Sequence, residues 1–197
     1  MRNLLPPLLL SSLLVLPVSA HASSAEAIFA GGCFWCMEEA FEQVEGVEEA
    51  VSGYIGGHLD NPTYYQVSQG QSGHTEAVQV SYDPDKISYN QLLDVFWTNI
   101  DPVDGGGQFC DRGSQYRSEI FYRTQEEKLL AEASKLKLTQ ADTLPSEIET
   151  DVTQASEFFV AEEYHQDYYR KNPVRYSFYK YSCGRAKRLE QLWGKAP

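Results

Sequence analysis

Residues 31–36 read Gly-Gly-Cys-Phe-Trp-Cys and join a short apolar run to a stretch with helical spacing. The apolar run at residues 27–30 predicts a strand, the two glycines predict a tight turn, and residues 37–44 carry the apolar stripe of an amphipathic helix. Cys33 should therefore lie at or near the N-terminus of that helix. Unpaired N–H groups and the helix dipole favour negative charge there, so we expect the pKa of the Cys33 thiol to fall towards neutrality.

Cys36 follows Cys33 by about one helical turn, so the two sulfurs should reach each other. An exposed, strained Cys-x-x-Cys is suited to making and breaking a disulfide. A purely structural bridge is a weak alternative for this pair, because closing so short a loop constrains the unfolded chain little. The dithiol therefore indicates redox chemistry.

Two further cysteines, Cys110 and Cys183, complete the set of four in the chain. An even number of cysteines in an oxidising compartment first suggests structural disulfides, and four cysteines allow three full pairings that sequence alone does not separate. A bridge between Cys110 and Cys183 is one possibility, and two free thiols are the other.

The first 22 residues have the pattern of a secretory signal peptide. Arg2 supplies a positive start, residues 4–18 are mainly apolar, and residues 20–22, Ala-His-Ala, form a small-x-small cleavage site. The apolar stretch is shorter than the roughly 18 to 20 residues that span a bilayer, and its prolines further disfavour a membrane anchor. We predict a signal peptide over residues 1–22 and a single domain over residues 23–197, exported across the inner membrane and most simply periplasmic.

The chain is acidic, with 28 Asp and Glu against 16 Lys and Arg and a formal net charge of −12. Basic residues gather only at residues 185–188, near the end. Such a chain repels the phosphate backbone of nucleic acid and anionic lipid, so we expect neither as a partner of the mature protein. We expect a monomer with one core, since about 175 residues are one domain's worth.

The rest of the chain alternates strand and helix patterns. Further strands are predicted at residues 47–54, 76–82, 118–122 and 148–152. Helices are predicted at residues 89–97, capped by Ser88, at residues 125–136, with a capping box of Thr124 and Glu127, and at residues 161–170. Because these elements both alternate and cluster, we predict an α+β two-layer sandwich with a mixed or mainly antiparallel sheet and packed helices.

Metal binding is not expected from the ligand-type residues. The sequence has one Cys-x-x-Cys and no second pair of closely spaced ligands. A zinc site would therefore need Cys110 or Cys183, which are distant in the sequence, as further ligands. A cysteine hydrolase would need His74 or His165 beside its thiol, and a second thiol one turn away would trap that nucleophile as a disulfide. The alternative that stays open is an exported general thiol-disulfide oxidoreductase that uses the Cys-x-x-Cys pair.

Phe34 and Trp35 lie between the two thiols. Adjacent aromatic rings beside a nucleophilic sulfur form an apolar wall, which suits a methyl thioether. The alternative is that one or both rings are ordinary core residues.

The segment over residues 32–38, Gly-Cys-Phe-Trp-Cys-Met-Glu, resembles the signature of the A-type peptide methionine sulfoxide reductases. The resemblance continues, in the family's order, through most of the mature chain. Further blocks carry it: Asn-Pro-Thr-Tyr at 61–64, Gly-His-Thr-Glu-Ala-Val at 73–78, Tyr-Asp-Pro at 82–84, Gly-Gln-Phe-Cys-Asp-Arg-Gly-Ser-Gln-Tyr-Arg-Ser at 107–118, and Ala-Glu-Glu-Tyr-His-Gln at 161–166. The resemblance implies an α+β domain with a ferredoxin-like core.

The same resemblance implies reduction of the S epimer of methionine sulfoxide, free or in proteins, and hence repair of oxidised proteins. It implies no bound metal or other cofactor and an external dithiol reductant of the thioredoxin type. Cys33 would attack the sulfoxide sulfur as a thiolate, and Glu76 matches the family acid that protonates the oxygen. Apolar, acidic surroundings can raise the pKa of Glu76 far enough to keep that proton.

Five positions match the family's substrate contacts. Tyr64 and Tyr116 match the tyrosines whose hydroxyls bind the sulfoxide oxygen, although spacing alone would not single them out in a chain with 13 tyrosines. Asp111 matches an acidic residue that contacts the substrate or orders its surroundings. Phe34 and Trp35 match the methyl pocket.

Reduction of the sulfoxide would leave Cys33 as a sulfenic acid, which a second thiol must resolve before further oxidation. Many family members carry glycine at the position of Cys36 and take the resolving cysteine from the carboxyl-terminal tail. We favour Cys36 as the resolving residue because it is close, with Cys183 as a possible second one. Cys110 is the least expected of the three.

Overall fold

The computed structural model describes residues 24–194, so the predicted signal peptide lies outside the described residues. The strands of the main sheet are β1 (Ala25–Gly31), β2 (Val47–Ile55), β3 (Thr75–Tyr82), β6 (Ser118–Tyr122), β7 (Asp151–Gln154) and β8 (Phe159–Val160). A separate hairpin pairs β4 (Gly107–Gln108) with β5 (Asp111–Arg112). The helices are α1 (Phe34–Glu42), α2 (Tyr64–Ser68), α3 (Tyr89–Thr98), α4 (Gln125–Ala141), α5 (Tyr168–Lys171), α6 (Pro173–Ser182) and α7 (Arg185–Trp193), with 3-10 turns at Ser114–Tyr116 and Glu163–His165.

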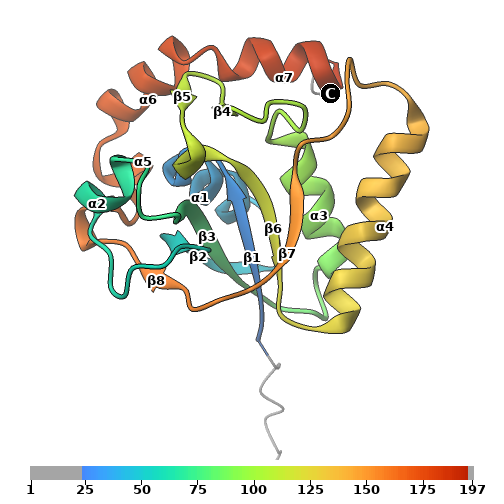
Figure 1. Cartoon of the computed structure of the whole chain (residues 1–197), viewed down its shortest axis with the longest axis horizontal. Coiled ribbons are helices and arrows are strands. Elements are labelled where there is room, and N and C mark those ends of the chain that lie inside the picture. Colours follow the sequence, from blue (N-terminus) through green and yellow to red (C-terminus); the bar gives the residue numbers. More distant parts are fainter. Residues whose placement is uncertain (1–23, 195–197) are drawn as a thin grey trace, which may run out of the picture.

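The main sheet has six strands in the order β7-β6-β1-β3-β2-β8 and lies at the centre of the molecule (Figure 1). Strands β6 and β7 are parallel, and the other neighbours are antiparallel. This mixed sheet agrees with the predicted one. No helix within residues 24–194 is long and apolar enough to cross a membrane.

The larger core lies between the sheet and the helices α1, α3 and α4, and aromatic rings form its centre. Phe29 of β1 stacks on Phe41 of α1 at 5.0 Å and on Phe96 of α3 at 5.3 Å between ring centroids. On the opposite face a small cluster around Ile28 and Phe121 is covered by residues of the connection between β7 and β8. One helical layer on one sheet confirms the predicted two-layer α+β fold.

The predicted strand, turn and helix around the first cysteine are present. Strand β1 ends at Gly31, α1 begins at Phe34, and Cys33 is the N-cap residue. Gly32 has a φ of +82°, and a Cβ atom on it would lie 2.5 Å from the Cβ of Gln108. Both the backbone conformation and the crowding therefore require glycine before the cysteine.

The two predicted helix caps form to different extents. Ser88 makes a complete capping box with Gln91 at the start of α3. Thr124 accepts a hydrogen bond from the N–H of Glu127, but the Glu127 carboxylate accepts from the N–H of Arg123, so the predicted box does not close. The helix nevertheless runs on to residue 141.

The predicted helix over residues 161–170 is wrong. A 3-10 turn and α5 replace it, separated by extended Gln166 and by Asp167 with a φ of 53°. The Gln166 amide bonds both the N–H and the carbonyl of Ser52 in β2, and the N–H of Asp167 donates to Glu38 in α1. These contacts with distant elements prevent a continuous helix through residues 166 and 167. The predicted strand at 148–152 is also displaced, since β7 begins at Asp151.

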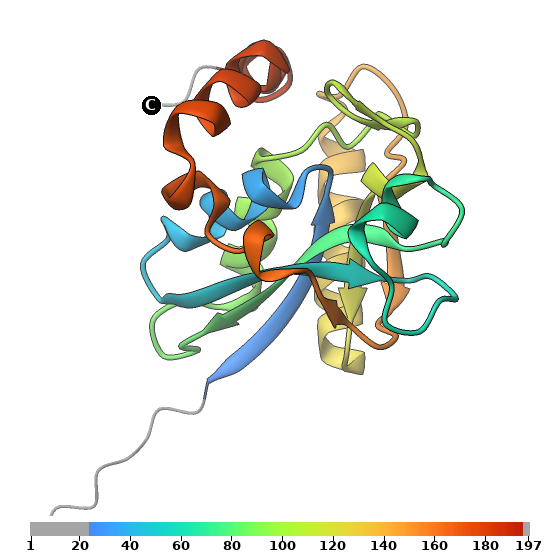
Figure 2. The ribbon, with the colours of Figure 1, turned by 90° about the vertical axis from the view of Figure 1, so that its left-hand side faces the viewer.

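Helices α6 and α7 were not predicted, and they lie outside the helical layer formed by α1 (Figure 2). Helix α6 contacts α1 through Tyr176 and Lys180, which both bond the carboxylate of Glu39. The carboxyl-terminal part of the chain thereby lies over the start of α1, where the two thiols are.

Candidate active site

A small cavity lies at the N-terminus of α1. The residues that line it are Cys33, Phe34, Trp35, Tyr64, Glu76, Asp111, Tyr116 and Tyr179. They come from α1, α2, β3, β5, the 3-10 turn before β6, and α6. The fold therefore brings together every substrate-contact residue and the acid expected from the sequence, and adds Tyr179.

Cys33 is buried, with 5% of its surface exposed. The first free N–H group of α1 does not donate to the Cys33 sulfur. That N–H, of Phe34, donates to Glu76 Oε2 at 3.0 Å. Burial, the hydrogen bond with Cys36 and the nearby carboxyl group of Glu76 together raise the pKa of Cys33. The expected fall of this pKa is therefore wrong, because burial and the interaction with Cys36 outweigh the helix dipole.

Cys36 is also buried, but the pKa of its thiol falls to about 6. The hydrogen bond from Cys33 is the largest cause, and Arg185, Tyr176 and Lys180 also lower it. The negative charge of the dithiol thus lies on Cys36 in the resting protein, with the proton on Cys33.

Glu76 lies on β3, buried to 3% exposure, and burial raises the pKa of its carboxyl group to about 8. The Phe34 N–H and the neighbouring acids have smaller effects. Glu76 is consequently protonated at neutral pH, which is the direction expected for a proton donor to an oxygen in the cavity.

The two cavity phenols are neutral hydrogen-bond donors. Burial raises the pKa of Tyr64 to about 12 and also raises that of Tyr116, and the two side chains share a hydrogen bond. Asp111 lies nearby on β5, and burial raises the pKa of its carboxyl group too. Its Oδ2 accepts a hydrogen bond from the Tyr179 hydroxyl at 2.5 Å.

The aromatic wall of Phe34 and Trp35 packs against His165 and Tyr168. Trp35 stacks on Tyr168 at 3.7 Å with the planes 8° apart, and its indole N–H donates to Nδ1 of His165 at 3.1 Å. Phe34 packs against the same histidine ring at 4.9 Å. Burial lowers the pKa of His165, so the ring stays neutral and accepts this bond.

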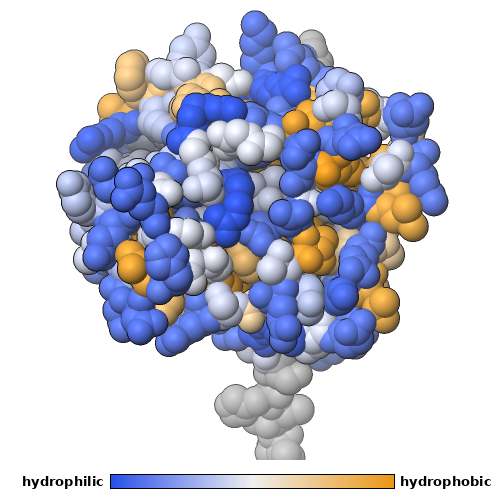
Figure 3. All heavy atoms as spheres, viewed as in Figure 1, coloured by the Kyte–Doolittle hydropathy of each residue, from blue (hydrophilic) through white to orange (hydrophobic). Residues whose placement is uncertain are grey.

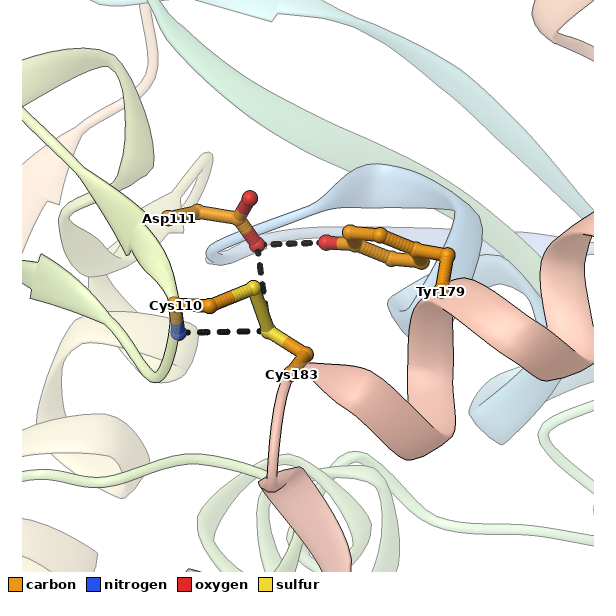
Figure 4. Close-up of a disulfide and its surroundings, with 4 residues drawn as sticks. All are labelled: Cys110, Asp111, Tyr179 and Cys183. Atoms are coloured by element: carbon orange, nitrogen blue, oxygen red, sulfur yellow. Dashed lines mark hydrogen bonds between the residues drawn. A yellow bond between two sulfur atoms is a disulfide. The ribbon is translucent and has the colours of Figure 1, made fainter.

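The sequence did not decide whether Cys110 and Cys183 are bonded. In the structure a disulfide joins them, with a Cα to Cα distance of 4.9 Å (Figure 4). Cys33 and Cys36 are the free thiols. The expected role of Cys183 as a second resolving residue therefore requires this bridge to open first.

Two groups of possible metal ligands occur within residues 24–194. Cys110, Asp111 and Cys183 form one, but its sulfurs bond each other. The other is a trio of carboxylates, Glu38, Glu42 and Asp167. None of the three lines the cavity.

Tyr176 and Tyr179 are the site residues that the sequence did not reveal. Tyr176 lies beside Cys36 and lowers the pKa of its thiol, and Tyr179 does the same for Cys33. Their spacing of three residues places both on one face of a helix, but only a correct prediction of α6 would have drawn attention to it.

Comparison with known proteins gives one consistent result. The family described as peptide methionine sulfoxide reductase matches residues 25–197. The chain is 50% identical over 168 residues to the peptide methionine sulfoxide reductase MsrA of Bacillus subtilis, covering 85% of this chain and 95% of that protein. Among solved structures, Mxr1 from Saccharomyces cerevisiae in reduced form has a TM-score of 0.72 and 29% identity, covering 77% of this chain and 87% of that one. Methionine sulfoxide reductase A of Corynebacterium diphtheriae has a TM-score of 0.69 and 31% identity, covering 80% and 79%.

Proposed function

This chain belongs to the peptide methionine sulfoxide reductase family, and on that premise we propose how its cavity reduces the S-sulfoxide of methionine. It is an oxidoreductase that returns methionine sulfoxide, free or in proteins, to methionine. One observation carries the proposal: a buried thiol, a protonated carboxyl group, two neutral phenols and an aromatic wall line the same cavity. These groups supply a nucleophile for the sulfoxide sulfur, a proton and hydrogen bonds for its oxygen, and an apolar contact for its methyl group.

The substrate is held through its methyl group and its oxygen. Its methyl group lies against Phe34 and Trp35, because an apolar thioether methyl gains from contact with aromatic rings. Its oxygen accepts hydrogen bonds from Tyr64 and Tyr116, whose raised pKa values keep them as donors. Glu76 donates the third hydrogen bond to the same oxygen.

The first step joins the Cys33 sulfur to the sulfoxide sulfur. The Cys33 proton passes to its hydrogen-bond partner, the Cys36 thiolate, and the Glu76 proton passes to the substrate oxygen. The substrate S–O bond and the new S–S bond then break, the OH group passes to the Cys33 sulfur as a sulfenic acid, and methionine leaves as a thioether that keeps the electron pair of the S–S bond. Glu76 is left ionised and takes a proton back from solvent.

The second step resolves the sulfenic acid. The Cys36 thiol attacks the Cys33 sulfur, a disulfide forms, and water leaves. Two electrons from an external dithiol, which we propose to be a thioredoxin-like protein, restore both thiols. Cys36 is favoured over Cys183 because Cys36 already hydrogen-bonds Cys33, whereas Cys183 is bonded to Cys110.

We also propose that the protein is exported and acts in the periplasm as a monomer. The proposed export rests on residues 1–22, with their positive start, apolar stretch and small-x-small site. Cell fractionation and N-terminal sequencing test it: a mature chain beginning near Ser23 in the periplasmic fraction is expected. Recovery of an uncleaved chain from the cytoplasm would overturn it.

Incubation of the mature protein with each epimer of methionine sulfoxide and a dithiol tests the reaction. Loss of the S epimer alone, abolished in Cys33→Ser, is expected. Turnover of neither epimer, together with rapid reduction of a model protein disulfide, would instead favour a general thiol-disulfide oxidoreductase that uses Cys33 and Cys36.

A further inference from the structure

Helix α6 covers the dithiol with one face and exposes the other. Tyr176 belongs to the cluster that contains Cys33 and Cys36, and Tyr179 packs against that cluster. The opposite face carries exposed apolar side chains: Val174 at 84%, Phe178 at 74% and Tyr181 at 88% exposure. Hydrophobic surface is visible over α6 at the upper left of Figure 3. The helix is therefore held in place from its inner face.

Tyr179 is the residue of α6 that reaches the reacting sulfur. It lines the cavity together with Cys33, its ring meets Trp35 edge-on at 5.9 Å, and its hydroxyl donates a hydrogen bond to Asp111. The same hydroxyl is near enough to the Cys33 sulfur to lower the pKa of that thiol. A phenol carries one proton. The hydroxyl that donates to Asp111 in the resting protein can turn that proton to Cys33 when the sulfur becomes a thiolate.

The Cys110–Cys183 disulfide lies beside Asp111 and Tyr179 (Figure 4). Cys183 follows α6 directly, and its N–H donates to the carbonyl of Tyr179 at 2.9 Å. Cys110 precedes Asp111 in the chain. The bridge thus ties the end of α6 to the strand that carries Asp111, and so fixes the distance of Tyr179 from the cavity.

We propose that Tyr179 is a catalytic residue, which stabilises the Cys33 thiolate by donating its hydroxyl hydrogen bond to the sulfur, and that the Cys110–Cys183 disulfide keeps it in reach. The inference rests on the proposed role of Cys33 as the nucleophile. The disulfide would thus act on the chemistry of Cys33 through the position of Tyr179.

The pH dependence of Cys33 alkylation tests the role of Tyr179 without any sulfoxide. The mature chain, with its bridge intact and Cys33 and Cys36 reduced, is treated with iodoacetamide. Chymotrypsin cleaves after Phe34 and Trp35, so mass spectrometry follows the two thiols on separate peptides. For Tyr179→Phe, the midpoint of the Cys33 profile should rise by about one pH unit, which corresponds to a roughly tenfold loss of thiolate.

The control is Tyr181→Phe on the exposed face of the same helix, which should keep the wild-type midpoint. A merely structural loosening would speed alkylation of Cys33 and Cys36 at every pH without moving the Cys33 midpoint. A wild-type midpoint in Tyr179→Phe would overturn the role of this residue, whether or not the protein reduces sulfoxides.

The double variant Cys110→Ser/Cys183→Ser tests the bridge. The pH midpoint of Cys33 alkylation should rise in this variant, as in Tyr179→Phe. Adding Tyr179→Phe to it should raise the midpoint little further, since both changes remove the same hydrogen bond. An unchanged midpoint in the folded double variant would overturn the role of the disulfide.

Discussion

The N–H of Phe34 donates a hydrogen bond of 3.0 Å to the Glu76 carboxyl group and so joins the start of α1 to the middle of the sheet. This bond uses the first free donor of the helix. It also holds the acid in the cavity beside Cys33, where its raised pKa keeps a proton for the substrate oxygen. The site is thus arranged around a neutral carboxyl group rather than around a preformed Cys33 thiolate.

Replacement of Glu76 by glutamine should lower the turnover number by roughly 10²-fold or more, because the amide cannot supply the acidic proton. Glutamine preserves the bond from Phe34, so the melting temperature should change little. Steady-state kinetics and thermal unfolding measure both effects. The exposed Glu49→Gln on β2 is the control, and wild-type turnover in Glu76→Gln would show that the acid is elsewhere.

The pH profile of kcat/KM should be bell-shaped. Activity should rise as the dithiol loses one proton near pH 6 and fall as Glu76 loses its proton near pH 8. In Glu76→Gln the alkaline limb should disappear, while the acidic limb remains. An alkaline limb that persists unchanged in this variant would assign the fall in activity to another group.

The aromatic wall should govern substrate binding. Trp35→Ala removes the ring that stacks on Tyr168 and should raise the KM for methionine S-sulfoxide by about tenfold, the effect of roughly 1.4 kcal/mol of lost contact. Trp193→Phe, on α7, is the control, because its indole bonds the carbonyl of Ile100 and does not line the cavity. An unchanged KM in Trp35→Ala would place the methyl group elsewhere.

The disulfide should also stabilise the fold. It closes a sequence separation of 73 residues, so Cys110→Ser/Cys183→Ser should lose roughly 2 to 5 kcal/mol in the free energy of unfolding. Urea unfolding of both proteins measures the loss, with Ser182→Ala beside the bridge as the control. Equal unfolding midpoints would mean that the bridge does not restrain the unfolded chain.

Local sequence signals predicted the part of the fold that depends on neighbouring residues. The strand, the glycine turn and α1 follow from residues 27–44, and the Ser88 cap places the start of α3. The break at Gln166 depends on Ser52, more than a hundred residues away, so no local pattern indicated it. Helix α6 escaped prediction because its tyrosines and polar residues lack a clear apolar stripe.

In the candidate site, too, some features could be predicted from the sequence and others depend on contacts between distant residues. The resemblance to a family gathered Glu76, Tyr64, Tyr116 and Asp111 from separate blocks, which spacing alone does not do. The predicted fall of the Cys33 pKa is wrong because burial and the close approach of Cys36 and Glu76 arise only in the folded chain. The role of Cys36 as resolving residue remains a prediction.

A single turnover without reductant tests the central claim most directly. The reduced mature protein, mixed with methionine S-sulfoxide, should release one methionine and form a Cys33–Cys36 disulfide, seen by mass spectrometry, while the bridge at Cys110 stays intact. Cys36→Ser should release the same methionine and stop at a Cys33 sulfenic acid. Formation of an intramolecular disulfide by Cys36→Ser as fast as by the wild type would contradict the account.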